Sequence, residues 1–280
     1  MRFVTVRSPR STYAARIEGD RIQPLAYRDV GEMLSAGISG AAIGAGAAGP
    51  TALGPRLDEV ELAPLVLRPE KIICVGLNYR KHILEMGREL PDYPTFFAKF
   101  ASALIGPRDP VSLPRLSQKM DWEAELAVVI GRHARHVDEE EALGVIAGYS
   151  VLNDVTARDF QNRTLQWLQG KTFEGTCPIG PFLVTPDEVD HGGDLEVLCE
   201  VDGEVVQRAR TSDLVFGPAR LVSYLSGIVT LAPGDVIATG TPGGVGAAMD
   251  PPRFLRPGSV VRTAIEHLGE CVNECVLEPA

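Results

Sequence analysis

Residues 121–130 read DWEAELAVVI, the stretch that decides how this chain is expected to fold. From Ala124 onward the run is apolar and rich in valine and isoleucine, which predicts a buried β-strand. Two glutamates, Glu123 and Glu125, lie two residues apart where this strand begins. Because positions two apart on a strand share a face, we expect the two carboxylates to lie side by side at the mouth of the strand.

Two carboxylates placed in this way repel each other, and one pKa rises unless a cation lies between them. Oxygen ligands of this kind suit a hard divalent cation, so the pattern predicts a Mg²⁺ or Mn²⁺ site. An edge strand with alternating polar residues facing water is the competing interpretation of the two glutamates taken alone.

Short runs of the same kind recur, separated by segments with glycine and proline such as PIGP, APGD and RPGS. The expected strands are residues 71–76, 124–131, 148–153, 195–201, 236–238 and 260–265. Helical spacing is confined to residues 139–146, 165–168 and 216–226. Many short strands with few helices indicate a mainly β (α+β) chain whose sheet closes or folds over, not a doubly wound sheet.

The first part of the chain differs from the rest. A strand pair is followed by an expected helix at residues 27–36, a Gly/Ala-rich run at 37–49 that we interpret as a loop or a loosely formed helix, and a proline-containing linker. The sequence therefore predicts a small N-terminal α/β domain over residues 1–65 and a larger domain over residues 66–280.

Composition limits the classes of function. The 280 residues are 45% hydrophobic, with no stretch long enough to cross a membrane and no apolar core of a secretory signal, so a cytoplasmic location is expected. A net charge of −10 without a basic cluster argues against nucleic-acid binding. The five cysteines form no CxxC pair, and we expect buried thiols, with neither a zinc site nor a disulfide framework.

A third acid, Asp154, follows the apolar strand at 148–153, where side chains reach a site beyond a strand end. It is a candidate third metal ligand, although Asn-Asp is also ordinary turn chemistry.

His82 and Glu85 are three residues apart in a stretch that could be helical, so they would share a face. A carboxylate beside an imidazole makes it a better general base, whereas a solvated helix turn is the alternative. The loop over residues 86–96 could close over a site.

Two further segments offer groups for an anionic substrate. Lys171 is one of five lysines in a chain with twenty-two arginines, and its ammonium could offset the charge of an enolate; a surface lysine is the alternative. The run TGTPGG at 239–244 contains Gly240 and Thr241 and could bind an anion through backbone N–H groups, or be a plain tight loop. The chain has neither a P-loop nor a GxGxxG fingerprint.

The order of these segments is more specific than any one of them. They are GLNYRKHILE (76–85), FFAKF (96–100), LIGP (104–107), DWEAELAVVIG (121–131), GYSVLNDVTARDFQ (148–161), GKTFEGTCPIGP (170–181) and LAPGDVIATGTPGGVG (231–246). This series resembles the fumarylacetoacetate hydrolase family over roughly residues 68–270. The resemblance implies a mixed β-roll catalytic domain, usually dimeric, with a Mg²⁺ or Mn²⁺ site.

The resemblance also implies roles for particular residues. The metal ligands would be Glu123, Glu125 and Asp154, and the catalytic groups would be His82 and Glu85 as a water-activating dyad and Lys171 facing the enolate. The expected substrate contacts are Asn78, Tyr79, Arg158, Gln161, Lys171, Gly240 and Thr241. The longer fumarylacetoacetate hydrolases have an aspartate near the position of Asn78, which favours the three-carboxylate site of the acylpyruvase-like branch here.

The expected activity is therefore hydrolysis of a C–C bond in a small 2,4-diketo acid of the acylpyruvate or fumarylpyruvate type. The same metal enolate can arise by decarboxylation of an oxaloacetate-like acid or by isomerisation of a 2-hydroxy-dienedioate, and a shared fold does not choose among these reactions. A non-catalytic protein that binds metal and ligand is a further alternative. A keto or enol acid is the expected partner, together with a second copy of the chain in a homodimer.

Overall fold

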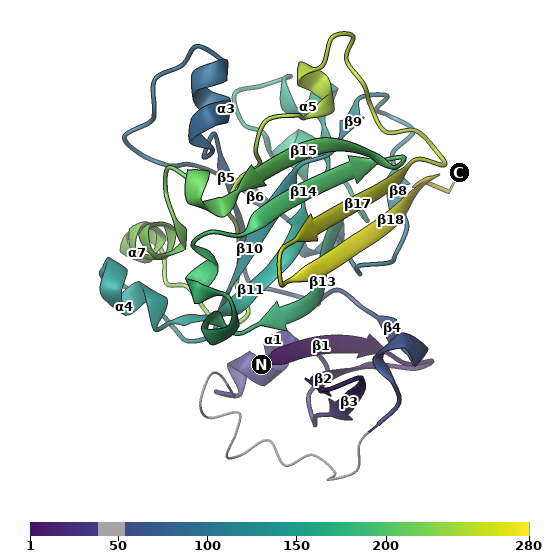
Figure 1. Ribbon diagram of the computed structural model, residues 1–280, viewed down its shortest axis with the longest axis vertical. Coiled ribbons are helices and arrows are strands. Elements are labelled where there is room, and N and C mark those ends of the chain that lie inside the picture. Colours follow the sequence, from purple (N-terminus) through teal and green to yellow (C-terminus); the bar gives the residue numbers. More distant parts are fainter. Residues whose placement is uncertain (39–53, 280) are drawn as a thin grey trace.

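A computed structural model describes residues 1–38 and 54–279 of the chain (Figure 1). Its strands are β1 (Arg2–Arg7), β2 (Thr12–Glu18), β3 (Arg21–Pro24), β4 (Glu61–Leu62), β5 (Ile72–Gly76), β6 (Thr95–Lys99), β7 (Leu104–Ile105), β8 (Val111–Leu113), β9 (Met120–Asp121), β10 (Ala124–Ile130), β11 (Ile146–Asn153), β12 (Thr156–Ala157), β13 (Cys177–Val184), β14 (Glu196–Val201), β15 (Glu204–Arg210), β16 (Val236–Ala238), β17 (Val260–Ile265) and β18 (Gly269–Leu277). Its α-helices are α1 (Val30–Ser35), α3 (Arg80–Glu85), α4 (Glu139–Leu143), α5 (Arg158–Gln161), α6 (Leu168–Lys171) and α7 (Pro218–Ile228). The fold is mainly β, as the sequence predicts.

Two sheets form the body of the molecule. The larger has eleven strands in the order β3-β2-β1-β13-β11-β10-β16-β5-β6, with β4 beside β1 and β7 beside β13. The smaller has the order β15-β14-β17-β18-β8 and lies in front of the larger sheet in Figure 1. The apolar core between them joins Leu126 and Val128 of β10 to Val197 and Val261 of the smaller sheet. This layered, folded-over arrangement confirms the predicted β-roll architecture.

Strand β10 lies in the middle of the larger sheet, between β11 and β16. Its side chains alternate between two cores: Leu126 and Val128 belong to the one facing the smaller sheet, Ala127 and Val129 to the one on the opposite face. All seven of its residues are buried. A strand in this position excludes the edge-strand interpretation of the two glutamates.

The strands expected at residues 71–76, 124–131, 148–153, 195–201, 236–238 and 260–265 are all present, with ends shifted by at most two residues. Helices occur near residues 27–36, 139–146 and 216–226 as expected, and the one expected at 165–168 lies at Leu168–Lys171. Most of the loop predicted at residues 37–49 falls outside the described residues. In the part of the chain that the structure describes, no helix is long and apolar enough to cross a membrane, and all five cysteines are buried.

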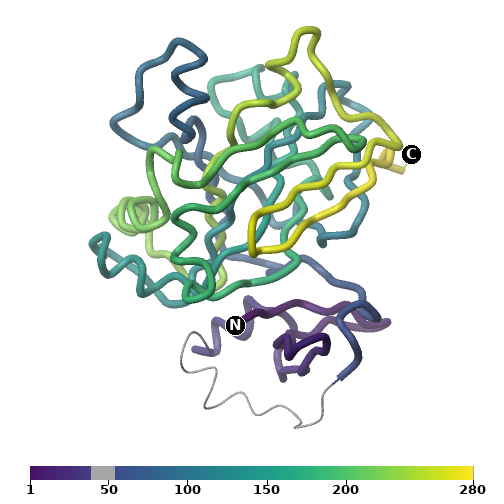
Figure 2. Tube along the Cα trace, viewed as in Figure 1, coloured from purple at the N-terminus to yellow at the C-terminus, as the bar shows by residue number. Residues whose placement is uncertain are grey.

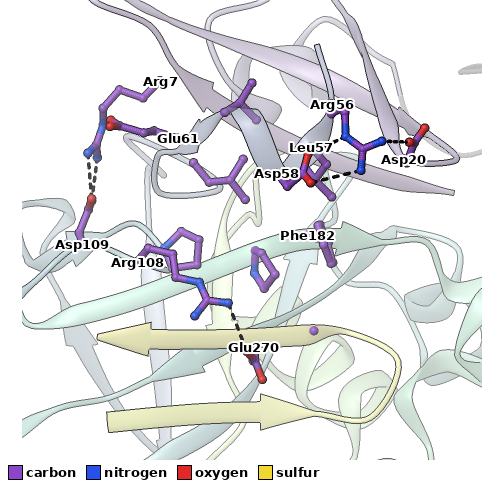
Figure 3. Close-up of a pocket in the computed structure, with 15 residues that line it drawn as sticks. Arg7, Asp20, Arg56, Leu57, Asp58, Glu61, Arg108, Asp109, Phe182 and Glu270 are labelled. Atoms are coloured by element: carbon purple, nitrogen blue, oxygen red, sulfur yellow. Dashed lines mark hydrogen bonds and ion pairs between the residues drawn. The ribbon is translucent and has the colours of Figure 1, made fainter. Parts of the chain in front are cut away.

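The N-terminal segment is joined to the rest by strand pairing. Strand β1 pairs with β13 through Arg2↔Val184 and Phe3↔Leu183, and the segment forms the lower part of the molecule in Figure 2. Ion pairs span the junction, where Arg7 binds Asp109 at 2.7 Å beside a groove of about 840 Å³ (Figure 3). The strands on either side of the expected boundary after residue 65 thus belong to one sheet, and separate folding of residues 1–65 stays a prediction.

Candidate metal centre and catalytic cavity

Three carboxylates meet where β10 begins and β11 ends. Glu123 immediately precedes β10, Glu125 is its second residue, and Asp154 follows the last residue of β11. Antiparallel pairing of Ala124 with Asn153 places these chain segments side by side, and the Asp154 N–H donates to the Glu123 carbonyl at 2.8 Å. One oxygen of each carboxylate lies within 4.8 Å of the others, and all three residues are buried. The sequence-predicted ligand set is therefore assembled in space.

The charges in this cluster fit a divalent cation. Burial, with Asp154 and Glu123 close by, raises the pKa of Glu125 well above its ordinary value. The backbone N–H of Gly240 donates to Glu125 Oε2 at 2.7 Å and fixes its orientation. Carboxylate oxygens are the donors that Mg²⁺ and Mn²⁺ prefer, and a cation would relieve the repulsion that raises the pKa. Glu123, Glu125 and Asp154 are the residues that would hold it.

Two buried lysines hold the same carboxylates. The Lys171 ammonium lies 2.7 Å from Glu123 Oε2 and 2.8 Å from Asp154 Oδ2, and the Lys99 ammonium lies 2.7 Å from Asp154 Oδ1. Burial alone would raise the pKa of Asp154, but the two ammonium groups outweigh it and lower that pKa. Lys171 is only 1% exposed, so the surface-lysine interpretation is wrong.

Replacing Lys99 with methionine is expected to destabilise the metal-free protein. The change leaves Asp154 buried with one cation instead of two, and breaking a buried ion pair costs about 3 kcal/mol or more. We expect the lower end of that range because Lys171 still pairs with Asp154. Urea unfolding measures the change, with the exposed Lys119→Met as the matched control. A free energy of unfolding equal to that of the parent chain would contradict the ion-pair argument.

Arg158 connects the metal cluster to the surrounding loops. Its Nη1 lies 2.6 Å from Glu123 Oε1 and donates to Gln161 Oε1 at 3.0 Å, while its Nε lies 2.7 Å from Asp121 Oδ2. Nη2 is buried with no hydrogen-bond partner among the described residues, so one donor is free for a ligand. Both Arg158 and Gln161, predicted as substrate contacts, lie at the site.

A cavity of about 320 Å³ opens onto this cluster. Its polar lining includes Glu123, Lys171, Arg158 and Thr241. The remaining lining residues are Val75, Gly76, Leu77, His82, Met86, Arg88, Phe97, Gln161, Asn162, Trp167, Val245, Ala247 and Ala248. The volume is at the lower end of the range for ligand pockets, about 300–1,000 Å³, and suits a small acid.

The predicted acid–base pair lies on α3, near the upper end of the molecule in Figure 1. His82 is half-buried and lines the cavity, whereas Glu85 is exposed and lines a neighbouring cavity of about 530 Å³. Burial lowers the pKa of His82, with Glu85 acting in the opposite direction. A Cβ on Gly243 would lie 3.2 Å from His82 Nδ1 and 3.4 Å from Glu85 Oε2, so the glycine lets the loop approach both groups closely.

The remaining predicted contacts divide into two sets. Gly240 binds Glu125 through its backbone and has a positive φ of 102°, and Thr241 lines the cavity. Asn78 is fully buried, and its amide bonds only to backbone groups of Thr239 and Phe216. Tyr79 is also buried and lines the neighbouring cavity. The structure thus places Asn78 and Tyr79 outside the lining of the 320 Å³ cavity, and their substrate contacts stay predictions.

Three residues at the site were not predicted from the sequence. Asp121 accepts hydrogen bonds from the N–H groups of Gly246 and Ala247 and pairs with Arg158. Gln207, on β15, accepts from the N–H of Ala124 and donates to Thr241 Oγ1 at 2.9 Å. Lys99 is the third. Only Lys99 carries a local signal, because a single lysine stands within the apolar strand FFAKF; the contacts of Gln207 span 83 and 34 residues.

Comparison with known proteins places this site in a family. The sequence model described as fumarylacetoacetate (FAA) hydrolase C-terminal matches residues 71–276, which include the three carboxylates, His82 and Lys171. The chain belongs to the fumarylacetoacetate hydrolase family. A buried Glu-Glu-Asp cluster that could bind a divalent metal is in keeping with this family.

Relatives within the family carry different names. The human mitochondrial oxaloacetate tautomerase FAHD2A is 48% identical over 224 residues, covering 79% of this chain and 71% of that protein. A solved fumarylacetoacetate hydrolase from Exiguobacterium antarcticum is 34% identical with a TM-score of 0.86. A 5-carboxymethyl-2-hydroxymuconate delta-isomerase from Mycobacterium smegmatis is also 34% identical, with a TM-score of 0.81. Each comparison with a solved structure covers 99% of this chain and 100% of the other.

Proposed function

We propose that the chain interconverts the keto and enol forms of a small 2-keto diacid of the oxaloacetate type, with bound Mg²⁺ or Mn²⁺. The observation that carries the proposal is one base, His82, on the cavity that also contains Glu123 and the buried Lys171. Relatives named as a tautomerase and a delta-isomerase support this class of reaction, because both reactions move a proton without breaking a carbon–carbon bond.

The side chains have complementary tasks in this reaction. A bound divalent ion supplies Lewis-acid polarisation of the 2-keto acid oxygens. The neutral imidazole of His82 takes a proton from the carbon beside the keto group and returns it to oxygen, so that one C–H bond breaks and one O–H bond forms. The ammonium of Lys171 shares the negative charge of the enolate. Glu85 orients the imidazole when α3 and the following loop approach the cavity.

The proposal is tested by the rate at which enol oxaloacetate converts to the keto form. Enol-rich oxaloacetate is mixed with the protein at neutral pH, and loss of the enol absorbance is followed with Mg²⁺, with Mn²⁺ and with excess chelator. We expect acceleration with either ion and loss of that acceleration with chelator. An enol decay that the protein leaves unchanged in all three conditions rejects the proposed reaction.

Hydrolysis of a 2,4-diketo acid is the second candidate, supported by the similarity to the Exiguobacterium antarcticum hydrolase. In that reaction His82 would deprotonate a water instead of a carbon acid, and the products would be a 2-keto acid and a carboxylic acid. Product analysis with acylpyruvates and fumarylpyruvate separates the two candidates, and carbon dioxide release from oxaloacetate identifies a decarboxylase. Metal-dependent binding without turnover of any substrate would indicate a non-catalytic protein.

The pH dependence follows from the state of His82. Burial lowers the pKa of this imidazole below the ordinary value of about 6.5, so the neutral base persists to more acidic pH than in a free histidine. We expect kcat/KM to be level near neutral pH and to fall as the pH decreases, with a midpoint below about 6.5. Arg88 and Arg158 act in the same direction as burial, and Glu85 and Glu123 oppose it. A midpoint above 6.5 would contradict this assignment of the base.

Two further expectations accompany this function as proposals. We propose a homodimer, as the family resemblance implies, and a cytoplasmic location. Sedimentation of the purified chain tests the first, and imaging of the tagged chain in its own cell tests the second.

A further inference from the structure

One cation on the cavity wall has no anionic partner. Arg158 and Lys171 also line the cavity, and both are bound to buried carboxylates. The guanidinium of Arg88 lines the same cavity but forms no ion pair with any described residue. An unpaired arginine on the wall of a polar cavity is available to a ligand, and its planar fork suits a carboxylate.

Arg88 is attached to the element that carries the base. It lies three residues after Glu85, and its N–H donates to the Ile83 carbonyl at 3.2 Å, which continues the end of α3. Gly87 precedes it with a positive φ of 69° and lets the chain turn there. Arg88 is also one of the charges that act on His82. The backbone of Arg88 is therefore fixed to the end of the helix that carries the imidazole, and both residues line the same cavity.

Without Arg88, the buried charges around the cavity and a bound divalent ion together would compensate the charge of one substrate carboxylate. Four buried acids, Asp121, Glu123, Glu125 and Asp154, surround three cations, Lys99, Lys171 and Arg158. With all of them ionised, one negative charge is left over. A divalent ion turns this into one positive charge, which matches a single carboxylate. A second carboxylate would leave one negative charge uncompensated, which a further cation would offset.

We propose that Arg88 binds the distal carboxylate of a dicarboxylic substrate, and that this contact selects diacids over monoacids. The inference rests on the proposed function, because it assumes that the 2-keto acid end lies at Glu123, Glu125 and Asp154. Since Arg88 is near His82, a distal carboxylate bound there brings the carbon between the two ends of a short diacid toward the imidazole. The selectivity then arises from position as well as from charge.

Binding of analogues that cannot enolise tests this role without any turnover. L-Malate and L-lactate both carry a 2-hydroxy acid group, but only malate has a second carboxylate. Calorimetric titration with saturating Mg²⁺ gives the Kd of each for the parent chain, Arg88→Met and Arg88→Lys. A charge-assisted contact predicts that the parent chain prefers malate by about tenfold to a hundredfold. In Arg88→Met that preference is expected to collapse while the Kd of lactate is unchanged, and Arg88→Lys is expected to keep part of it.

The matched control is Arg80→Met, which removes the exposed arginine at the start of α3 that is not among the cavity-lining residues. A preference for malate that survives in Arg88→Met overturns the proposal. So does an equal loss in Arg80→Met, which would indicate a general surface charge effect, and so does a parent chain that binds malate no better than lactate. If the preference depends on Arg88 but oxaloacetate is not tautomerised, the proposed reaction fails and the binding role stands.

Discussion

Replacing His82 with alanine is expected to slow the metal-dependent enol–keto conversion by about 10²–10⁴-fold, the range typical of a lost general acid or base. His82 is the histidine that lines the cavity of Glu123 and Lys171, and its lowered pKa keeps it in the proton-accepting form. Among the described residues, no hydrogen bond or ion pair joins the His82 side chain to the metal-binding carboxylates. The affinity for Mn²⁺ should therefore stay within a few-fold of the parent chain.

Stopped-flow measurement of the enol absorbance gives the rate, and calorimetry gives the Mn²⁺ affinity of the same preparation. His133→Ala is the matched control, because His133 is exposed and is not among the cavity-lining residues. A His82→Ala chain that retains the parent rate would show that another group transfers the proton. A parallel loss of metal affinity would show instead that the helix supports the metal cluster.

Glu125→Gln is the second change with a large expected effect. The substitution keeps the shape of the side chain and removes one of three ligand charges. We expect at least a hundredfold loss in Mn²⁺ affinity, because losing a residue that only hydrogen-bonds to a metal ligand already costs about 10–100-fold. Turnover should fall to the level seen with chelator. The metal-free protein should not lose stability, because burial and two neighbouring carboxylates already disfavour the charge on Glu125.

Calorimetry with Mn²⁺ and thermal unfolding with and without the ion distinguish these outcomes. In the parent chain the ion should raise the Tm, since it binds the folded state, and in Glu125→Gln that rise should disappear. The exposed Glu274→Gln on β18 is the matched control. An unchanged Mn²⁺ affinity in Glu125→Gln would remove this carboxylate from the proposed ligand set.

Local sequence pattern predicts the central part of the fold. The run from Ala124 to Ile130 combines β-branched residues with complete burial, so its position inside a sheet follows from composition. Placement of Glu123 and Glu125 on one face follows from the twofold repeat of a strand. Asp154 joins them because it directly follows β11, the strand that pairs with β10. The shared face of Glu123 and Glu125 and the position of Asp154 at the end of a strand could therefore be predicted from neighbouring residues in the sequence.

The cations and amides that support these carboxylates needed the tertiary structure. Lys99 and Asp154 are 55 residues apart, and the amide of Gln207 reaches β10 from the other sheet. Asn78 also needed the tertiary structure, because its amide binds three backbone groups of two distant segments, while its predicted substrate contact stays a prediction. Nothing in the local pattern distinguishes a side chain that fixes a loop from one that faces a cavity.

The ammonium group of Lys171 between Glu123 and Asp154 has a consequence for the metal-free protein in a cell. Three built-in cations, Lys99, Lys171 and Arg158, neutralise most of the buried acids, so we expect the chain to fold and stay folded without a divalent ion. Scarcity of Mg²⁺ or Mn²⁺ would then leave an intact but dormant pool instead of a degraded one. When the ions return, that pool would regain activity by binding them, with no new protein synthesis.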